Sequence, residues 1–431
     1  VGFNNLGFDY PIIHDIMGRA ATSMCTVTDI YMKSQAIIND TTRFAHLVWE
    51  SDHIVPQLDL YKIHDFVNQA RSTGLKMLEF NMRSNTIEDL PFPPGTALTF
   101  EQMDTLIDYN WKDVGETEKF YHETLDMIRF REELSVKYGR NFLNHNDTKI
   151  GKDFFIMELE KANISCYTKL PGQSRQPVQT IRNQIHLRDA VFPYVQFFSP
   201  EFERIRQWFL NQTITETKGV FKDLSCTVGG FEFVFGLGGI HGSVKPCTVL
   251  SDDYYSIIDL DVTSYYPSLA IANGVYPEHL SNKFCDIYKD VKHQRSQHKK
   301  GTPENAMLKL ALNGVYGDSN NQYSPFYDPL YTMKITINGQ LLLCMLAEHL
   351  MQIQGLEMIQ INTDGLTIKV PRHNEPMVKF ITEWWQAFTL LELEEVRYSR
   401  MFIRDVNNYI GEYEDGKLKR KGCYEYDLEW H

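Results

Sequence analysis

The sequence predicts a multidomain protein that combines α-helices with β-strands. Its 431 residues, 43% of them hydrophobic, suffice for two to four domains that each bury a core. An apolar strand-like run at 255–258 precedes a helical segment at 265–273, and residues 283–317 have the pattern of two helices. Alternating apolar residues at 355–370 indicate a β-hairpin. Strands and helices thus alternate through the second half of the chain, which is typical of an α/β protein.

The first half of the chain gives fewer local signals. Residues 99–135 are predicted to form one helix, with Thr99 as the N-cap and an acidic first turn. Its buried face is expected to contain four apolar residues: Met103, Leu106, Ile107 and Val114. Residues 231–235 have the pattern of a strand. The four glycines within 236–243 indicate either a flexible joint or a tight turn with positive φ.

Three local signals delimit the elements that follow. Gly301-Thr302-Pro303 stops one helix and starts the next. Asn362-Thr363-Asp364-Gly365 has the composition of a hairpin turn. Strand alternation places Asp259 and Asp261 on one face of the strand that ends near residue 262. Either carboxylate could ligate a metal ion on this argument alone.

The formal net charge of −13 is unusual for a protein that binds nucleic acid. Basic residues nevertheless cluster at 289–300 and 417–421, which indicates basic channels on an acidic body. Solvated helix faces would produce the same clusters. No apolar stretch is long and uninterrupted enough to predict a membrane span, and no phosphate-binding loop of the Walker type occurs. The seven scattered cysteines predict a reducing cytoplasm, with neither disulfides nor a zinc site.

Three motifs in the second half carry candidate chemistry. They read Asp261-Val262-Thr263-Ser264-Tyr265-Tyr266-Pro267-Ser268, then Lys309-Leu310-Ala311-Leu312-Asn313-Gly314-Val315-Tyr316-Gly317, then Gln360-Ile361-Asn362-Thr363-Asp364-Gly365. Two aspartates can hold two divalent metal ions, which stabilise the attacking and leaving oxygens of an in-line displacement at phosphorus. With a helix face of Lys, Asn and Tyr between them, these are the components of a nucleotidyl transferase.

The order and wording of these motifs resemble family B DNA polymerases, particularly the compact bacteriophage type. Tyr265 stands where the first motif has Leu, Gly314 where the second has Ser, and Asn362 where the third has its first Asp. In the family the second Asp of that motif ligates metal, so Asp364 should suffice. The resemblance implies a ribonuclease H-like 3′–5′ exonuclease domain followed by a right-hand polymerase of palm, fingers and thumb.

The resemblance also implies a division of the chain. An N-terminally incomplete exonuclease domain is expected at 1–130 and a linker or N-terminal-type region at 131–235. The polymerase is then expected as palm with the first motif at 236–282, fingers at 283–320, palm with the third motif at 321–375, and palm end with the start of the thumb at 376–431.

Within the polymerase, the resemblance assigns roles to named residues. Asp261 and Asp364, with the backbone of Val262, would bind two Mg²⁺ or Mn²⁺ ions, and Asp261 is preferred to Asp259 because only it has the family spacing. Tyr266 would exclude a 2′-hydroxyl, although it would also fit as a core residue. The other expected contacts to the nucleotide are Ser264, Tyr265, Arg295, Lys299, Lys309, Asn313 and Tyr316, with Lys309 also protonating the departing pyrophosphate.

Two shorter matches concern an exonuclease site. Asn4-Asn5-Leu6-Gly7-Phe8-Asp9 resembles its second motif, and Tyr109-Asn110-Trp111-Lys112-Asp113 its third. Asp9 and Asp113 would bind metal there, and Tyr109 would orient the attacking water. A first motif, D-x-E, is expected upstream of Val1. Asp427-Leu428-Glu429 has that spelling at the wrong end of the chain and is interpreted as chance. Proofreading is therefore expected only of a longer protein.

The expected partners are primer–template DNA, deoxynucleoside triphosphates and replication accessory proteins. The expected location is the cytoplasm, which is that of a bacterial host if the protein is phage-encoded. Tyr409, Lys419 and Lys421 are the expected DNA contacts. The segments 243–254 and 269–308 are too short for the insertions of protein-primed relatives, so extension of a nucleic-acid primer is expected. Two alternatives stay open: a nuclease with a degenerate second half, and a non-catalytic DNA-binding replication subunit. A primer-extension assay distinguishes them.

Overall fold

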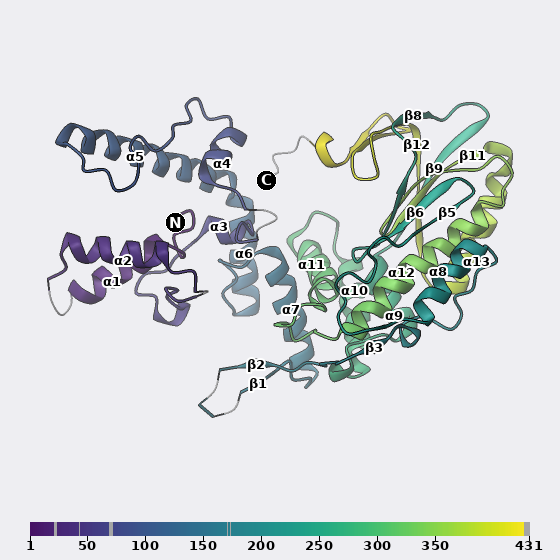
Figure 1. Ribbon diagram of the computed structural model, residues 1–431, viewed down its shortest axis with the longest axis horizontal. Helices are drawn as coiled ribbons and strands as arrows, with labels where there is room; N and C mark the ends of the chain where they lie inside the picture. Colours follow the sequence, from purple (N-terminus) through teal and green to yellow (C-terminus); the bar gives the residue numbers. More distant parts are fainter. Residues whose placement is uncertain (21–23, 43, 69–71, 170, 173, 426–431) are drawn as a thin grey trace. The chain divides into compact units, whose positions relative to one another are not determined.

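The computed structural model describes residues 1–20, 24–42, 44–68, 72–169, 171–172 and 174–425 (Figure 1). The chain forms two compact units, the first from Val1 to Ile150 and the second from Gly151 onward. The boundaries expected at residues 130 and 235 do not coincide with this division. The Asp427-Leu428-Glu429 sequence lies outside the described residues.

The first unit is built from helices. They are α1 (Asp9–Ala20), α2 (Val27–Asn39), η1 (Glu50–Asp52), α3 (Leu60–Ile63), α4 (Leu75–Asn81), α5 (Phe100–Glu123) and α6 (Leu125–Tyr138), and α7 (Asp147–Lys161) continues into the second unit. Among its described residues the extended pairing is an isolated bridge between Gly2 and Asp59. The expected ribonuclease H-like fold is therefore not confirmed, since that fold is organised around a sheet.

The expected helix at 99–135 begins where predicted but divides at Thr124. Thr99 caps α5 and forms a capping box with Gln102. The hydroxyl of Thr124 donates to the carbonyl of Phe120 at 2.8 Å and lies 3.0 Å from His64 Nε2. The predicted buried face is wrong, because Met103, Ile107 and Val114 are exposed. Burial falls instead on the end of α5 and on α6, where Phe120 and Ile128 join a cluster with Leu60, Ile63, Phe66 and Leu78.

The second unit contains one large antiparallel sheet. Its strands are β5 (Ser225–Val228), β6 (Phe231–Phe235), β7 (Ile240–Ser243), β8 (Cys247–Leu250), β9 (Tyr255–Val262), β10 (Glu357–Asn362), β11 (Gly365–Pro371), β12 (Leu393–Ile403), β13 (Tyr409–Tyr413) and β14 (Leu418–Arg420). Their order is β14-β13-β12-β9-β11-β10-β7-β6-β5, and β8 pairs with β12. The predicted strand at 231–235 and the predicted hairpin at 355–370 are both confirmed. Strands β9 and β11, which flank the two motif aspartates, lie at the centre of the sheet.

Helices and short strands complete the second unit. They are β1 (Tyr167–Thr168), β2 (Gln176–Pro177), β3 (Ile185–His186), η2 (Leu187–Asp189), α8 (Pro200–Leu210), β4 (Thr213–Ile214), α9 (Tyr265–Asn273), η3 (Glu278–Leu280), α10 (Lys283–Gln297), α11 (Pro303–Asp318), α12 (Pro329–Leu350), η4 (Arg372–Asn374), α13 (Glu375–Thr389) and η5 (Gly422–Tyr424). The predicted helices at 265–273 and 283–317 are confirmed, the latter with its break between α10 and α11. Thr302 caps α11 and Pro303 is its first residue.

Helix α12 is the core helix of this unit. Among the described helices it alone is long and apolar enough to cross a membrane, but 89% of its most apolar window is buried inside the protein. In Figure 1 it runs beside the sheet, together with α8 and α13. Nineteen of its 22 residues are buried, and apolar residues therefore occur on all its faces. It is the rigid support for the elements that carry the motifs.

The glycine-rich segment at 236–243 is not a flexible joint. Its second half is strand β7, which pairs with β6 and β10. Its first half, the turn 236–239, is fixed by the amide of Gly236, which donates to Gln340 Oε1 at 2.9 Å. Gly239 has a φ of 145°, where glycine is favoured. The glycines therefore permit a tight turn inside the second unit. All seven cysteines are free thiols.

Candidate active site

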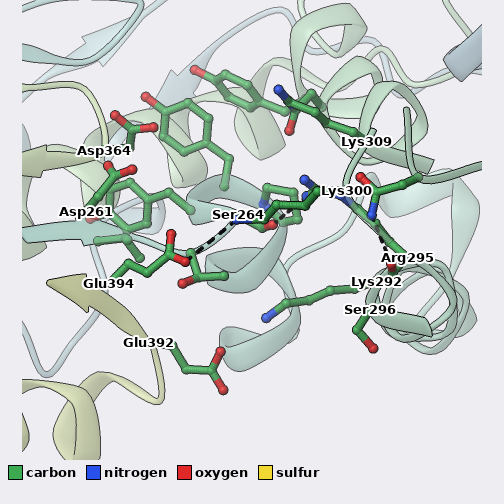
Figure 2. Close-up of a pocket in the computed structure, with 18 of the residues that line it drawn as sticks. Asp261, Ser264, Lys292, Arg295, Ser296, Lys300, Lys309, Asp364, Glu392 and Glu394 are labelled. Atoms are coloured by element: carbon green, nitrogen blue, oxygen red, sulfur yellow. Dashed lines mark hydrogen bonds and ion pairs between the residues drawn. The ribbon is translucent and has the colours of Figure 1, made fainter. Parts of the chain in front are cut away.

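The two motif aspartates meet at the centre of the large sheet. Asp261 lies near the end of β9, and Asp364 lies in the turn between β10 and β11. Gly365 pairs directly with Asp261, and the amide of Val262 donates to the carbonyl of Asp364 at 2.8 Å. Figure 2 shows both carboxylates at one side of a cavity, with Lys309 and Arg295 on the other. Backbone pairing thus brings together two residues that are far apart in the sequence.

A close backbone approach requires glycine at position 365. A Cβ atom there would lie 2.5 Å from the carbonyl oxygen of Leu260 and 2.9 Å from Asp261 Oδ1. Real carbon–oxygen contacts are longer, so any side chain would displace β9 or rotate the carboxylate of Asp261. Gly365 therefore leaves the space that Asp261 occupies.

The surroundings of the two aspartates disfavour their negative charges. Burial, followed by repulsion from Asp364 and Asp259, raises the pKa of Asp261 to about 7. Burial also raises the pKa of Asp364. A carboxylate that is both desolvated and close to a like charge is stabilised by a cation. The electrostatics of this pair therefore fit a site for a positive ligand.

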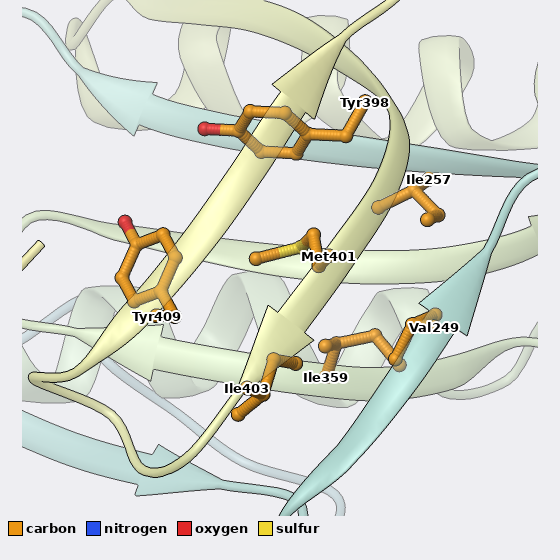
Figure 3. Close-up of a cluster of buried hydrophobic side chains, with 7 residues drawn as sticks. All are labelled: Val249, Ile257, Ile359, Tyr398, Met401, Ile403 and Tyr409. Atoms are coloured by element: carbon orange, nitrogen blue, oxygen red, sulfur yellow. The ribbon is translucent and has the colours of Figure 1, made fainter. Parts of the chain in front are cut away.

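An apolar cluster on the sheet adjoins these carboxylates (Figure 3). Ile257 lies two residues before Asp259 and four before Asp261 on β9, so the three side chains project to the same face. Ile257 packs in a cluster with Val249, Ile359, Tyr398, Met401, Ile403 and Tyr409. The carboxylates thus stand at the edge of a packed core, which restricts where they can move.

The cavity beside Asp261 and Asp364 has a volume of about 750 Å³. Its other walls come from the start of α9, from α10 and α11, and from the segment before β12. The lining residues are Asp261, Val262, Thr263, Ser264, Tyr265, Tyr266, Pro267, Lys292, Arg295, Ser296, His298, Lys300, Asn305, Lys309, Asn313, Tyr316, Thr363, Asp364, Glu392 and Glu394. Carboxylates on one wall and cations on the opposite wall make the cavity strongly polar.

The cations come mainly from the antiparallel α10–α11 pair. Arg295 donates to Ser264 Oγ at 3.1 Å, and Lys292 donates to Ser268 Oγ at 2.9 Å. Neither of these bonds neutralises a charge. In the part of the chain that the structure describes, Lys309 forms no ion pair with a carboxylate either. Three cationic groups that face one cavity without acidic partners are suited to bind an anion.

Lys299 does not belong to this group. Helix α10 ends at Gln297, so Arg295 and Lys299 do not share a helix face as the sequence predicted. Lys292 and Lys300 line the cavity in its place, and Lys300 also lies 3.8 Å from Glu394. Lys292 was recognisable from the sequence, because it precedes Arg295 by three residues and therefore shares its face. Lys300 belongs to the basic cluster at 289–300, but no motif distinguished it within that cluster.

The expected aromatic contacts divide into two kinds. Tyr266 and Tyr316 line the cavity with their ring centroids 4.3 Å apart, and Asn313 lies one turn before Tyr316 on α11. The side chain of Tyr265 instead points into the core, where its hydroxyl donates to the carbonyl of Gly339. Only the backbone of Tyr265 is available to a ligand. Ser264 and Tyr265 start α9, and the first amides of a helix have no partner within it.

A second cavity, of about 290 Å³, is also lined by Asp261 and Asp364. Its lining includes the three expected DNA contacts, Tyr409, Lys419 and Lys421. The ammonium group of Lys419 lies 3.2 Å from Asp259 Oδ2, and that of Lys421 lies 3.6 Å from Glu425. Asn362, which replaces an aspartate of the motif, also lines this cavity. The structure therefore places the proposed DNA contacts next to the carboxylates, although both lysines have acidic partners.

The three residues expected to form an exonuclease site are not brought together. Asp9 is the first residue of α1, whereas Tyr109 and Asp113 lie one turn apart on α5. Lys76 forms an ion pair of 2.6 Å with Asp113 and another of 2.9 Å with Glu79, and its ammonium lies 4.7 Å from the centre of the Tyr109 ring. Among the described residues no interaction joins Asp9 to Asp113. A lysine thus neutralises the carboxylate that was expected to bind metal.

The described residues contain no group of three or more His, Cys, Asp or Glu side chains that could hold a metal ion by themselves. The available donors are the carboxylates of Asp261 and Asp364 and the nearby carbonyl of Val262. Mg²⁺ commonly binds to one or two carboxylates and completes its shell with waters and substrate phosphates. The donor set therefore fits Mg²⁺ or Mn²⁺ together with a phosphate-bearing ligand.

Comparisons with known proteins find both sequence and structural similarity. No protein-family model matches the chain. The sequence is 25% identical over 206 residues to DNA polymerase II of Escherichia coli (strain K12), covering 39% of this chain and 26% of that protein. The fold is similar to the family B DNA polymerase of the hyperthermophilic archaeon Pyrobaculum calidifontis, with a TM-score of 0.43, 15% identity, and coverage of 97% of this chain and 51% of that one. The chain thus spans about a quarter of the length of the bacterial protein it matches.

Proposed function

We propose that this chain contains the nucleotidyl transfer site of a DNA-directed DNA polymerase. The observation that carries the proposal is the large cavity, in which Asp261 and Asp364 face the cations of the α10–α11 pair across a space of about 750 Å³. Two carboxylates opposite Arg295 and Lys309 suit a nucleoside triphosphate, whose phosphates must contact metal and protein cations at once. The distant sequence similarity to a DNA polymerase agrees with this assignment.

The carboxylate wall has the properties of a divalent cation site. Asp261 and Asp364, with the carbonyl of Val262, would hold Mg²⁺ or Mn²⁺, because a cation offsets the repulsion that raises the pKa of Asp261. Bound there, such ions would supply polarisation of the attacking hydroxyl and neutralisation of the leaving group. The role of the protein is to keep both carboxylates in place, and the pairing of Gly365 with Asp261 does this.

The cationic wall would bind and orient the triphosphate. Arg295 and Lys292 are already held by the hydroxyls of Ser264 and Ser268, so little conformational freedom is lost when a phosphate binds. The first amides of α9 add donors that suit phosphate oxygens. Lys309 has an ammonium proton to donate to the departing pyrophosphate. These residues bind, orient and transfer a proton, and none of them needs to form a covalent bond.

The aromatic wall would receive the sugar and base. The ring of Tyr266 lies at the edge of the cavity next to that of Tyr316, where it would occupy the space that a 2′-hydroxyl needs. Asn313 and Tyr316 lie on the same face of α11 and would flank the nascent base pair. The site would therefore select deoxynucleotides by exclusion and not by a hydrogen bond.

The second cavity would hold the primer terminus. Lys419, Lys421 and Tyr409 share this cavity with Asp261 and Asp364, so a primer terminus bound there would lie next to the carboxylates that hold the metal ions. Lysine contacts to phosphates position a duplex without reading its sequence. We therefore infer that the chain extends a nucleic-acid primer. We include accessory replication proteins among the proposed partners.

A single-nucleotide primer-extension assay tests this function. The chain is mixed with a primer–template and one complementary deoxynucleotide, with Mg²⁺ or Mn²⁺, and the product is resolved on a gel. Extension by wild type and a loss of at least about a hundredfold in Asp364→Ala are expected, since a metal carboxylate contributes several kcal/mol to the transition state. DNA affinity should be retained in this variant.

Asp253→Ala is the matched control. Asp253 is an exposed aspartate in the loop before β9, and it lines neither cavity. Its substitution should leave extension unchanged. DNA binding without any metal-dependent turnover by wild type would instead identify a non-catalytic DNA-binding subunit. Cleavage of DNA without extension would identify a nuclease.

Proofreading stays a prediction for a longer protein. In the first unit Lys76 forms an ion pair with Asp113 next to Tyr109, so this carboxylate is not open to a metal ion. We expect no 3′–5′ degradation of single-stranded DNA by this chain. Degradation that Asp113→Ala abolishes would overturn this expectation, because it would require Lys76 to leave the carboxylate.

A further inference from the structure

Gly339 occupies an unusual position in the middle of the buried helix α12. Glycine within a helix costs about 1 kcal/mol relative to alanine, so a glycine there indicates a local steric constraint. A Cβ atom at this position would lie 3.0 Å from Cε1 of Tyr266 and 3.7 Å from Cε1 of Tyr265. The hydroxyl of Tyr265 also donates to the carbonyl of Gly339. The absence of a side chain therefore lets α12 pack directly against the tyrosines that start α9.

The ring of Tyr266 is confined on its other sides as well. Its hydroxyl donates to the carbonyl of Gly238 at 2.8 Å, and its ring lies against that of Tyr316. The turn that contains Gly238 is held in its turn by α12, because Gln340 accepts the amide of Gly236 at 2.9 Å. Helix α12 thus fixes both the ring and the hydroxyl of Tyr266. The remaining free direction is the cavity that this residue lines.

Tyr316 is tied to the same supports. Its hydroxyl lies 2.6 Å from Thr336 Oγ1 and donates to the carbonyl of Leu237 at 3.4 Å. Thr336 lies one helical turn before Gly339 and Gln340 on α12. One turn of a helix therefore supports both cavity tyrosines, and no residue of this support lines the cavity itself.

We propose that Gly339 and the turn 236–239 set how far Tyr266 projects into the cavity, and that they thereby determine the discrimination between deoxyribonucleotides and ribonucleotides. The inference rests on the proposed function, because it takes the cavity to be a nucleotide site. It makes Gly339 a positioning residue that acts through Tyr266 without touching the substrate.

The argument predicts opposite effects for two substitutions. In Gly339→Ala the new methyl group presses on the Tyr266 ring from behind. Since α12 is packed on all sides, the ring must move by a few tenths of an ångström toward the cavity. In Tyr266→Phe the bond to Gly238 is lost, so the ring loses the anchor that fixes its depth in the cavity. The first change narrows the space for a 2′-hydroxyl, and the second relaxes the limit on that space.

Equilibrium titration with nucleotides tests the proposal without requiring turnover. The binding of dATP and of ATP to the full chain with primer–template is measured in the presence of Ca²⁺. The Kd of ATP divided by the Kd of dATP is then compared between variants. Gly339→Ala should raise the ratio about fivefold, because unfavourable contacts in a rigid pocket cost about 1 kcal/mol. Tyr266→Phe should lower it by a similar factor.

Two further variants separate positioning from general damage. Gly115→Ala replaces a helical glycine in α5 whose added Cβ would meet no described atom within 4 Å, and it should leave the ratio unchanged. In Gly339→Ala combined with Tyr266→Ala, the ring is absent, so the alanine at 339 should no longer alter the ratio. A merely structural role for Gly339 would lower thermal stability and leave the ratio unaffected in both backgrounds.

The possible outcomes separate the inference from the proposed function. If the discrimination between dATP and ATP shifts as described but no primer is extended, the inference is supported and the proposed polymerase activity is refuted. Extension with an unchanged ratio in both Gly339→Ala and Tyr266→Phe overturns the inference alone. Equal binding of dATP and ATP by wild type also overturns it, because the ring would then not contact the sugar. If Gly339→Ala fails to fold, the result for Tyr266→Phe decides.

Discussion

The contact between α7 and α11 predicts a strong effect from the smallest possible substitution. A Cβ atom added at Gly151 in α7 would lie 2.3 Å from the carbonyl carbon of Leu310, 2.4 Å from its oxygen and 2.7 Å from the amide nitrogen of Ala311. These are backbone atoms of α11, so no change of rotamer relieves the clash. Non-bonded carbon atoms prefer about 3.5–4.0 Å, so Gly151→Ala must separate the two helices by about 1 Å.

The cost of that separation follows from the burial of α11. Leu308, Ala311 and Leu312 are at most 2% exposed, and all three lose packing when the helix shifts. Overpacking costs about 1–3 kcal/mol, and a backbone clash belongs at the upper end of that range. At about 2 °C per kcal/mol for a unit of this size, the midpoint of thermal unfolding should fall by about 6 °C. Lys309 moves with α11, so nucleotide affinity should fall about tenfold as well.

Thermal denaturation followed by fluorescence, and nucleotide titration on the same samples, measure both effects. Gly317→Ala is the matched control, because Gly317 lies on the same helix and an added Cβ there would meet no described atom within 4 Å. It should melt at the wild-type temperature or slightly above, since alanine is the better helix former. A Gly151→Ala protein that melts within about 1 °C of wild type would refute the close contact, given the expected sensitivity.

Three further predictions follow from single contacts. In a nucleotide titration, Lys292→Ala should weaken binding about tenfold and Lys299→Ala should change it less than about twofold, because only Lys292 lines the cavity. A larger loss in Lys299→Ala than in Lys292→Ala would instead support Lys299 as the nucleotide contact, as the sequence predicted. The affinity for Mn²⁺, measured by calorimetry, should fall about tenfold for each pH unit below pH 7 and should level off above pH 7. The reason is that the pKa of Asp261 is about 7, so a proton competes with the metal for this carboxylate. A flat profile from pH 5 to 8 would count against Asp261 as a ligand. Burial raises the pKa of Glu348 from 4.5 to about 7, so the ionisation of this side chain opposes folding. Its contribution to stability is fully present below pH 4.5 and is lost as the pH rises through 7. Glu348→Gln should therefore be more stable than wild type by about 2–3 kcal/mol at pH 8 but not at pH 4.5. Chemical denaturation at both pH values measures this difference, and equal differences at the two pH values would contradict it.

Local signals were sufficient for the elements that carry the motifs. The Gly301-Thr302-Pro303 break is encoded in three adjacent residues, and Thr302 caps α11 as such a sequence implies. The hairpin turn at 362–365 lies between strands that pair from Asn362 and Gly365 back to Glu357 and Lys369, with one register shift between Met358 and Gln360. In each case the interactions that decide the structure lie within a few residues, so periodicity and turn chemistry identify them.

The end of α10 shows why other features could not be predicted. No glycine or proline occurs at 298–300, and the sequence therefore allowed the helix to continue through Lys299. The helix stops because Asn305, at the start of α11, donates to the carbonyls of Arg295 at 3.2 Å and of His298 at 2.9 Å. A residue of the next helix thus supplies the cap. That interaction depends on how the two helices pack, which periodicity does not reveal.

The first unit shows the same limit on a larger scale. The apolar residues at the start of α5 suggested a buried face, yet the core forms at its end, around Phe120. Lys76 and Asp113 are 37 residues apart, and neither lies in a segment whose pattern predicts their contact. A motif as short as Y-x-x-x-D therefore identifies the carboxylate but not its partner. The partner decides whether that carboxylate can bind a metal ion.

The choice between Asp259 and Asp261 depends on their hydrogen bonds. Strand alternation places both on one face, and the sequence preferred Asp261 only by family spacing. In the structure Asp259 accepts from Thr367 at 2.7 Å, Tyr398 at 2.9 Å and Lys419 at 3.2 Å.

Among the described residues no group donates to Asp261, which is repelled by Asp364 instead. A carboxylate with three donors is already stabilised as an anion, whereas one that lacks donors and faces a like charge gains most from a cation. The same face of one strand therefore carries a satisfied aspartate and an unsatisfied one. The unsatisfied aspartate is the one that borders both cavities.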